Sequence, residues 1–97
     1  MLYNFNNMIN LKTYKKFQSN SDWTEVYNKL ERNFNFQDFK QALKFINEIS
    51  IICEEEKHHP EINWIYNKIS LKLSTHDAGD IITEKDIKLA KLIDECY

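Results

Sequence analysis

The sequence has very few of the residues that break regular structure or cross-link small domains. Its 97 residues include one glycine, one proline and two cysteines, which excludes a loop-rich, fibrous or disulfide-dense scaffold. Cys53 and Cys96 are too few and too far apart for a disulfide framework or a CxxC metal site. We therefore expect two free thiols in a reducing compartment, which predicts a cytoplasmic protein.

Long apolar runs and an excess of one charge are also missing. No apolar stretch approaches the roughly 20 residues needed to cross a bilayer, and residues 1–10 lack the basic and apolar regions of a signal peptide. The net charge is −2, which gives no concentrated basic stripe for nucleic acid. Lys12, Lys15 and Lys16 cluster near the start, and we interpret them as solvated. We expect no membrane and no direct nucleic-acid partner.

The residues that are present fit one small globular domain. Hydrophobic residues make up 42% and charged residues 29% of the chain, as in ordinary soluble domains. A chain of this length buries only about 60–65% of its unfolded surface, so we expect self-association to stabilise it. Residues 1–20 are Asn-rich and weakly periodic. We predict an N-terminal arm or short helix over 1–20 and a single domain over 21–97.

The first half of the domain predicts a hairpin followed by a helix. A β-prone run at 23–27 precedes an expected turn at 28–29, and apolar residues then alternate with polar ones over 30–36. From Asp38 the apolar positions are three and four apart, which predicts a helix that ends near Lys57. The expected buried face consists of Phe39, Ala42, Leu43, Ile46, Ile49 and Cys53.

The second half repeats this order. Residues 64–75 alternate between apolar and polar side chains and predict β structure, and residues 77–82 are the connecting loop. Thr83 and Asp86 form a capping box, with Asp in place of the usual Glu or Gln, at the start of a last helix. Four strands with helices on one face make an α+β domain.

The three histidines are the candidates for chemistry. His58 and His59 are adjacent, Pro60 follows them, and His76 lies just past a predicted strand. Imidazole gives and takes protons near neutral pH, and one placed imidazole contributes roughly 10²–10⁴ in rate as a general acid or base. Two other interpretations stay open: a His-His pair in a polar loop is often simply solvated, and histidine is a frequent zinc ligand. Because no CxxC or HExxH spacing accompanies the histidines, we expect no metal.

Neighbouring residues have competing interpretations as well. Glu54 lies at the predicted C-terminal end of a helix, where the macrodipole disfavours carboxylates, and a broken local rule tends to mark a functional site. For Asp86, helix capping is a complete explanation. Trp64 and Tyr66 have the shape to stack on a flat heterocycle, but aromatic residues in strands more often belong to the core.

Four motifs follow one another in the second half of the chain, and a strand with Arg32, Phe34 and Phe36 precedes them. The motifs are EEEKHHPE at 54–61, YNKI at 66–69, LSTHDAG at 73–79 and TEKD at 83–86. A lone HHP would be weak, but this ordered combination is specific. It resembles the pterin-4a-carbinolamine dehydratase family over about residues 22–95.

The resemblance implies a fold and a reaction. The fold is a four-stranded antiparallel sheet with two or three helices packed on one face, so that residues 21–97 form a single domain of this family. The reaction is that of a hydro-lyase, which dehydrates 4a-hydroxytetrahydropterin (4a-hydroxytetrahydrobiopterin) to quinonoid dihydropterin without metal or cofactor, recycling pterin after aromatic amino-acid hydroxylation. A homodimer or homotetramer is implied. The alternative is a non-catalytic binding module, because some relatives are dimerisation cofactors of a transcription factor.

The same resemblance assigns site residues. The catalytic residues would be His58, His59 and His76, with His58 as base and either His59 or His76 as acid. The expected substrate contacts are Glu54, His58, His59, Pro60, Thr75, His76, Asp77 and Ala78. Two positions depart from the family pattern: Lys57 replaces a common Asp or Asn, and Ile62 replaces an aromatic residue.

Overall fold

The computed structural model describes residues 22–97, so the arm predicted at 1–20, with Lys12, Lys15 and Lys16, lies outside the described residues. The described part contains four strands, two α-helices and one 3₁₀ turn. In chain order these are β1 (Thr24–Val26), β2 (Lys29–Asn35), α2 (Phe39–Glu56), β3 (Glu61–Ile65), β4 (Lys68–Leu73), η1 (His76–Ala78) and α3 (Glu84–Asp94).

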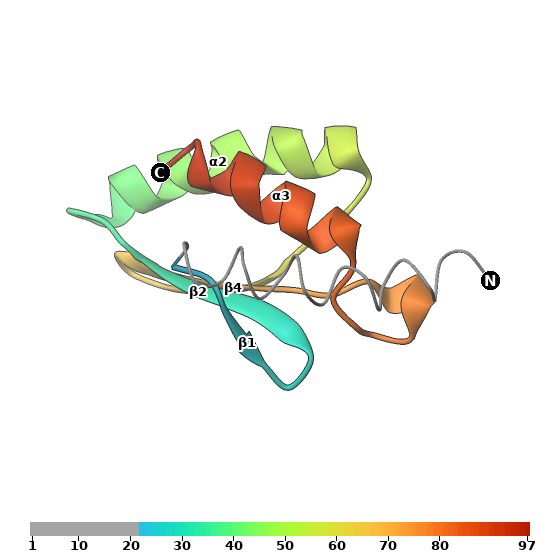
Figure 1. Cartoon of the computed structure of the whole chain (residues 1–97). Coiled ribbons are helices and arrows are strands. Elements are labelled where there is room, and N and C mark those ends of the chain that lie inside the picture. The colour runs from blue at the N-terminus through green and yellow to red at the C-terminus, as the bar shows by residue number, and fades with distance from the viewer. Residues whose placement is uncertain (1–21) are drawn as a thin grey trace.

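The four strands form one antiparallel sheet in the order β1-β2-β4-β3. Both helices lie on the same face of this sheet (Figure 1). β2 and β4 occupy its centre, and their helix-facing apolar side chains, among them Phe34 and Leu71, are buried. The predicted α+β fold is therefore confirmed. None of the described helices is long and apolar enough to cross a membrane.

The first hairpin turns one residue earlier than the sequence predicts. Tyr27 and Asn28 have φ values of 51° and 65°, and two consecutive left-handed residues form the tight turn whose twist matches that of the flanking strands. A tyrosine is not a residue that sequence rules place at a positive φ. The turn was therefore predicted at the more polar pair that follows.

The second hairpin begins earlier than the β structure predicted at 64–75. Its first strand, β3, starts at Glu61, and the turn into β4 begins at Tyr66, which has a φ of 51°. Ile65 and Tyr66 are 73% and 60% exposed, so the expectation that Tyr66 belongs to the core was wrong. The reason is that β3 lies at the sheet edge and buries few side chains, which weakens the alternation that marks a strand.

α2 begins and ends where the sequence predicts, but its buried face is rotated. Asp38 caps the helix by accepting a hydrogen bond from the backbone N–H of Gln41 at 2.9 Å. Phe39 and Leu43, predicted as buried, are 49% and 40% exposed, because the helix turns a neighbouring stripe toward the sheet. Phe39 instead stacks on Trp64 with ring centroids 4.7 Å apart. The buried residues of α2 are Ala42, Phe45, Ile49 and Cys53.

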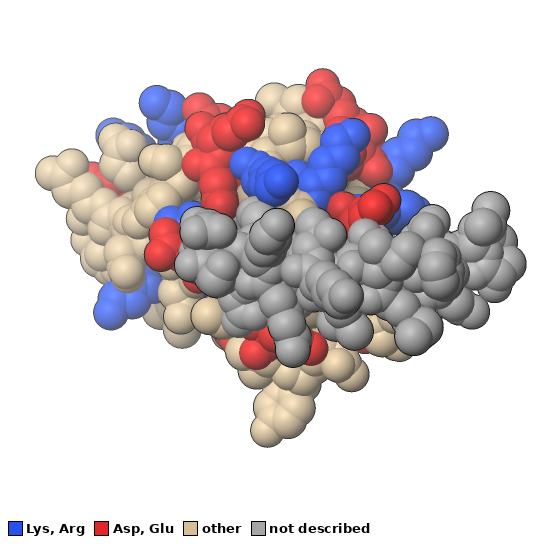
Figure 2. Space-filling view, viewed as in Figure 1, with Lys and Arg blue, Asp and Glu red and all other residues tan. Residues whose placement is uncertain are grey.

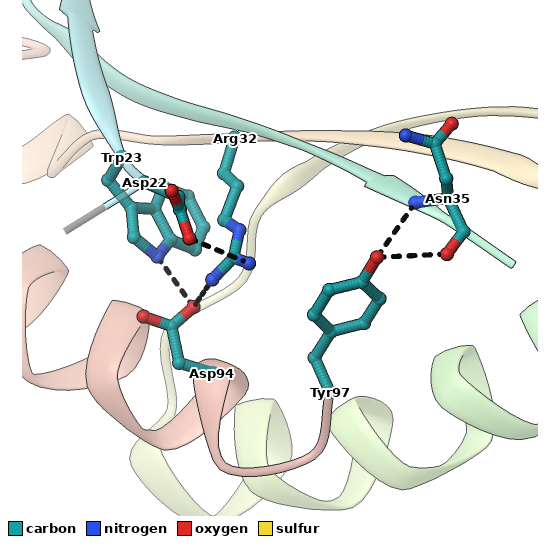
Figure 3. Close-up of polar contacts among 6 residues, drawn as sticks. All are labelled: Asp22, Trp23, Arg32, Asn35, Asp94 and Tyr97. Carbon is teal, nitrogen blue, oxygen red and sulfur yellow. Dashed lines mark hydrogen bonds and ion pairs between the residues drawn. The ribbon is translucent and has the colours of Figure 1, made fainter.

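Asp94, the last residue of α3, connects this helix to the first hairpin through hydrogen bonds. Its Oδ1 accepts hydrogen bonds from Trp23 Nε1 at 2.8 Å and from Arg32 Nη1 at 2.7 Å (Figure 3). Three residues further on, the Tyr97 hydroxyl donates to the carbonyl of Asn35 at 2.9 Å. These contacts fix α3 on the sheet and thereby position the loop that precedes the helix.

Lys57 follows α2 in a left-handed conformation, with φ of 54° and ψ of 42°. This geometry costs a residue with a Cβ roughly 1–2 kcal/mol, and Asn tolerates it better than Lys. We expect Lys57→Asn to raise the free energy of unfolding by up to about 1 kcal/mol, measured by urea denaturation. The same substitution at Lys44, exposed inside α2, should lower it, because Asn is a poorer helix former. Equal effects at both positions would contradict this account.

Candidate functional site

The candidate site is built around a carboxylate at the start of α3. The Thr83 hydroxyl accepts a hydrogen bond from the backbone N–H of Lys85 at 3.3 Å, and Asp86 Oδ2 accepts one from the backbone N–H of Thr83 at 2.9 Å. The predicted capping box is therefore confirmed. The Asp86 side chain is also completely buried. Buried carboxylates need several partners, and capping supplies only one.

Asp86 has its other partners in distant parts of the chain. The Thr75 hydroxyl donates to Asp86 Oδ2 at 2.8 Å, and Nε2 of His58 lies 2.5 Å from Asp86 Oδ1. Thr75 follows β4 and His58 follows α2, so three segments converge on one carboxylate. The interpretation of Asp86 as a helix cap alone was wrong, because the cap uses Oδ2 and leaves Oδ1 for His58.

His59 belongs to a separate and more open pair. Its Nε2 lies 2.6 Å from Glu54 Oε2, and the two side chains are 59% and 77% exposed. Beside this pair is a cavity of about 230 Å³, whose lining includes Pro60 and Ile62. Typical small-molecule pockets measure roughly 300–1,000 Å³. This cavity is therefore large enough for part of a heterocyclic ligand only.

His76 lies in η1, one residue after Thr75, and its side chain is 91% exposed. Its Nδ1 is 3.1 Å from Oδ1 of Asp80. The hydrogen bond with Asp80, followed by the charges of Asp80 and Asp77, raises the pKa of His76 above its ordinary 6.5. Neighbouring carboxylates favour the imidazolium form in this way.

Removing the Asp80 charge is expected to bring the pKa of His76 back toward 6.5. Because the pKa in the folded protein is the higher one, the pair stabilises the fold below about pH 6.5, and this contribution is lost as pH rises through the folded value. An NMR titration should give a lower His76 midpoint for Asp80→Asn than for wild type. Glu84→Gln, which also removes one exposed charge, should leave the midpoint unchanged. A midpoint insensitive to Asp80→Asn would contradict the pairing.

The structure connects His58 with the loop of His76, but it does not join the three rings directly. Among residues 22–97, no hydrogen bond links any two of His58, His59 and His76; each ring is paired with its own carboxylate. The link is Thr75, whose side chain contacts the partner of His58 and whose neighbour is His76. Asp77 and Ala78 belong to η1 with His76. The two predicted site segments therefore meet at Asp86.

Sequence reasoning missed the residues that support His58. Thr75, expected to contact substrate, is 3% exposed, and its hydroxyl is engaged inside the protein with Asp86 and Thr83. Asp86 is 28 positions from His58, and no linear pattern connects them. The single available signal was a hydroxyl residue just after a strand and another just before a helix, and that signal is common in proteins.

The described residues contain no metal-binding cluster, and the thiol of Cys53 is unreactive. Residues 22–97 contain no group of three or more His, Cys, Asp or Glu side chains that could hold a metal ion. Burial, with a smaller effect of the Glu54 charge, raises the pKa of the Cys53 thiol to about 11. That thiol is protonated at neutral pH and is a poor nucleophile or metal ligand.

This α+β domain, with imidazole–carboxylate pairs at adjacent loops, defines a site suited to proton transfer. A family model described as pterin 4 alpha carbinolamine dehydratase matches residues 8–96. Two similar proteins are each named "Putative pterin-4-alpha-carbinolamine dehydratase". The one from Prochlorococcus marinus (strain MIT 9515) is 47% identical over 75 residues, and the one from Sulfurisphaera tokodaii is 45% identical over 73. These alignments cover 77% and 75% of this chain, and 77% of each relative.

The chain belongs to the pterin-4-alpha-carbinolamine dehydratase family. A solved structure described as a transcriptional coactivator/pterin dehydratase from Brucella melitensis matches it with a TM-score of 0.82 and 28% identity, covering 88% of this chain and 93% of the other. A pterin dehydratase-like RuBisCO assembly factor of the alpha-carboxysome matches with a TM-score of 0.66 and 22% identity, covering 78% and 89%. This second likeness bears on the fold alone.

Proposed function

We propose that the protein catalyses the dehydration of 4a-hydroxytetrahydropterin to quinonoid dihydropterin and water. The observation that carries this proposal is the pairing of half-buried His58 with buried Asp86, 2.5 Å apart, beside the loop that bears His76. A buried, hydrogen-bonded carboxylate orients an imidazole for proton transfer. Membership of the family supports the choice of a pterin as the substrate.

The reaction needs only two proton transfers. A proton delivered to the 4a-hydroxyl oxygen lets the C4a–O bond break and water leave, while N5 loses its proton as the C4a=N5 double bond forms. One imidazolium and one neutral imidazole supply both steps without metal or redox cofactor. We assign the base to His58 and the acid to His59 or His76, with Glu54 as the partner of His59.

The proposed substrate surface consists of the two loops that meet at Asp86. One carries His58, His59 and Pro60, with Glu54 beside them, and the other carries His76, Asp77 and Ala78. Their exposed side chains are free to contact a flat heterocycle and its substituent. For Thr75 we propose a supporting role, because its hydroxyl is directed inward.

A non-catalytic role is the second candidate. The Brucella structure is described as a coactivator as well as a dehydratase, and the domain exposes apolar side chains that suit a protein partner. We also propose a homodimer or homotetramer, because β3 is an edge strand on which Ile62 and Ile65 are 46% and 73% exposed. Exposed edges of this kind favour pairing with another chain. This oligomeric state is tested by measuring the molecular mass of wild type and of Ile62→Lys by light scattering.

We place the protein in the cytoplasm, with no direct nucleic-acid partner. Both cysteines are free thiols, as is usual in a reducing compartment. On the face drawn in Figure 2, Lys and Arg side chains are intermingled with Asp and Glu, without a broad surface of one sign. Proteins that bind nucleic acid non-specifically concentrate basic side chains instead.

The proposal is tested by locating a stable pterin on the protein. A 7,8-dihydropterin, which has no 4a-hydroxyl to lose, is titrated into isotopically labelled protein and followed by NMR. We expect the largest shifts at residues 58–60 and 75–78. Shifts confined to the opposite face of the sheet, around Asn33 and Asn63, would contradict the proposed site. Binding at the expected loops without turnover would favour the non-catalytic role.

A further inference from the structure

The hydrogen bonds around Asp86 have a direction, which follows from counting hydrogens. The Thr75 hydroxyl has one hydrogen, and it is donated to Asp86 Oδ2 at 2.8 Å. In the 2.6 Å contact between the hydroxyls of Thr75 and Thr83, Thr83 must therefore be the donor. Thr83 therefore donates to Thr75, and Thr75 donates to Asp86. All three side chains are buried.

The carboxylate in turn requires a donor from His58. Oδ2 of Asp86 accepts from the Thr75 hydroxyl and from the backbone N–H of Thr83, so two hydrogens point at this oxygen, as at a carboxylate acceptor. An ionised carboxylate can only accept hydrogen bonds. At 2.5 Å from Oδ1, the Nε2 atom of His58 must therefore carry a hydrogen.

The other ring nitrogen of His58 is free of such a constraint. Among residues 22–97, Nδ1 of His58 makes no hydrogen bond, and the one buried side-chain nitrogen or oxygen without a partner is Nε of Arg32. Nδ1 therefore reaches the surface, although the His58 side chain is only 12% exposed. Nδ1 is therefore the ring nitrogen that a substrate can reach.

We propose that the Thr83–Thr75–Asp86 chain fixes neutral His58 as the Nε2–H tautomer, so that Nδ1 is the atom that exchanges protons with the substrate. The inference rests on the proposed function for its catalytic part. When Nδ1 takes the proton released from N5, the ring becomes an imidazolium with hydrogens on both nitrogens, and the Nε2 hydrogen stays on the ring and is donated to Asp86 Oδ1. Thr75, Thr83 and Asp86 are positioning residues in this scheme.

Asp86→Asn tests the tautomer by reversing one hydrogen bond. Two donors, the Thr75 hydroxyl and the Thr83 N–H, face the position of Oδ2, so the Asn oxygen must occupy it. The Asn NH₂ group then faces His58, and Nε2 must accept instead of donate. The neutral ring of His58 in the variant becomes the Nδ1–H tautomer, whose surface nitrogen can no longer accept a proton.

The readout is the ¹⁵N NMR spectrum of the His58 ring at a pH where the ring is neutral. Wild type should show a protonated Nε2 and an unprotonated Nδ1, and Asp86→Asn should show the reverse. The dehydration rate of the variant should fall by about 10²–10⁴-fold, as expected for an imidazole locked in the wrong tautomer. Glu84→Gln, an exposed acid of the same helix turn, should change neither the spectrum nor the rate.

Thr75 provides an independent test of the chain. Thr75→Ser keeps the hydroxyl and should preserve the wild-type tautomer. Thr75→Val has nearly the same shape but no hydroxyl, so Asp86 loses one donor and the His58 ring signals should broaden or split between tautomers, with a lower rate. Identical spectra for the Ser and Val variants would overturn the role given to Thr75.

The inference about the tautomer and the proposed function are contradicted by different experimental results. An unprotonated Nε2 in neutral wild-type His58 overturns the inference whatever the activity is, and this measurement needs no variant to fold. A folded Asp86→Asn protein that keeps the wild-type spectrum overturns it as well. The predicted tautomer in a protein without dehydratase activity would support the hydrogen-bond chain and count against the proposed function alone.

Discussion

Replacing His58 with Gln is expected to lower the rate of dehydration by about 10²–10⁴-fold, the usual contribution of one acid–base imidazole. The Gln side chain can still donate a hydrogen bond to Asp86, so the buried carboxylate keeps a partner. It has no basic nitrogen, so it cannot take up a proton. The variant therefore separates proton transfer from the structural role of the contact. The rate is measured on freshly prepared 4a-hydroxytetrahydropterin, after subtraction of spontaneous dehydration.

His58→Ala is the companion variant, because it leaves a space where the imidazole was. Added imidazole should restore part of its rate, whereas it should not restore that of His58→Gln. Lys40→Gln, an exposed change in the first turn of α2, serves as the control and should behave as wild type. A His58→Gln rate within a factor of two or so of wild type would show that His58 transfers no proton in the slow step.

Phe34→Ala is expected to lower the free energy of unfolding by about 3–5 kcal/mol, the usual cost of removing a buried aromatic ring. Phe34 is completely buried near the end of β2, one of the two central strands of the sheet. Its ring centroid lies 4.8 Å from that of Phe45 and 4.9 Å from that of Tyr97, and the Arg32 guanidinium is 4.6 Å from it. One truncation therefore removes contacts to α2 and to Tyr97, which follows α3.

The size of this loss decides whether the domain folds at all. Domains have free energies of unfolding of about 5–15 kcal/mol, and a small one lies near the lower end. Urea denaturation should therefore show Phe34→Ala with a much lower midpoint, or unfolded in buffer. Tyr27→Ala is the matched aromatic control, since Tyr27 is 94% exposed, and it should change stability by less than about 0.5 kcal/mol. Similar losses for both would contradict the assignment of the core.

The helices were predictable because their signals are local. Asp38 and Thr83 are caps with a side-chain oxygen, and the spacing of apolar residues behind them fixes the helical period. The orientation of α2 about its own axis was not predictable, because the helix has more apolar residues than one face can bury. Phe39 is apolar and compatible with a helix, so its residue type does not show whether it is buried. Which side of α2 contacts the sheet depends on strands that are far away in the sequence.

Strands at the sheet edge were harder to predict than those at its centre. β2 alternates clearly because one of its faces is covered by both helices, and its range was predicted well. β3 has Ile62 and Ile65 exposed, so the pattern of its side chains does not follow burial. The turns at Tyr27 and Tyr66 lack the glycine or asparagine that usually marks a positive φ at the first turn position.

For the candidate site, residue types identified the histidines but not their arrangement. His58 and His59 were found because imidazole exchanges protons near neutral pH, and the family motif gave them a role. The sequence does not reveal that one pairs with a buried carboxylate and the other with an exposed one. That division depends on α3 docking against the loop after α2, which is a tertiary property.

The most direct test of the central claim compares three samples in one dehydration assay: buffer, wild-type protein, and the His58→Gln, His76→Ala double variant. Each receives the same freshly made 4a-hydroxytetrahydropterin, and the appearance of quinonoid dihydropterin is followed by absorbance. We predict that wild type accelerates the loss of water well above the buffer rate and that the double variant returns to near that rate. A folded wild-type protein that gives only the buffer rate, or a double variant as fast as wild type, would contradict the claim.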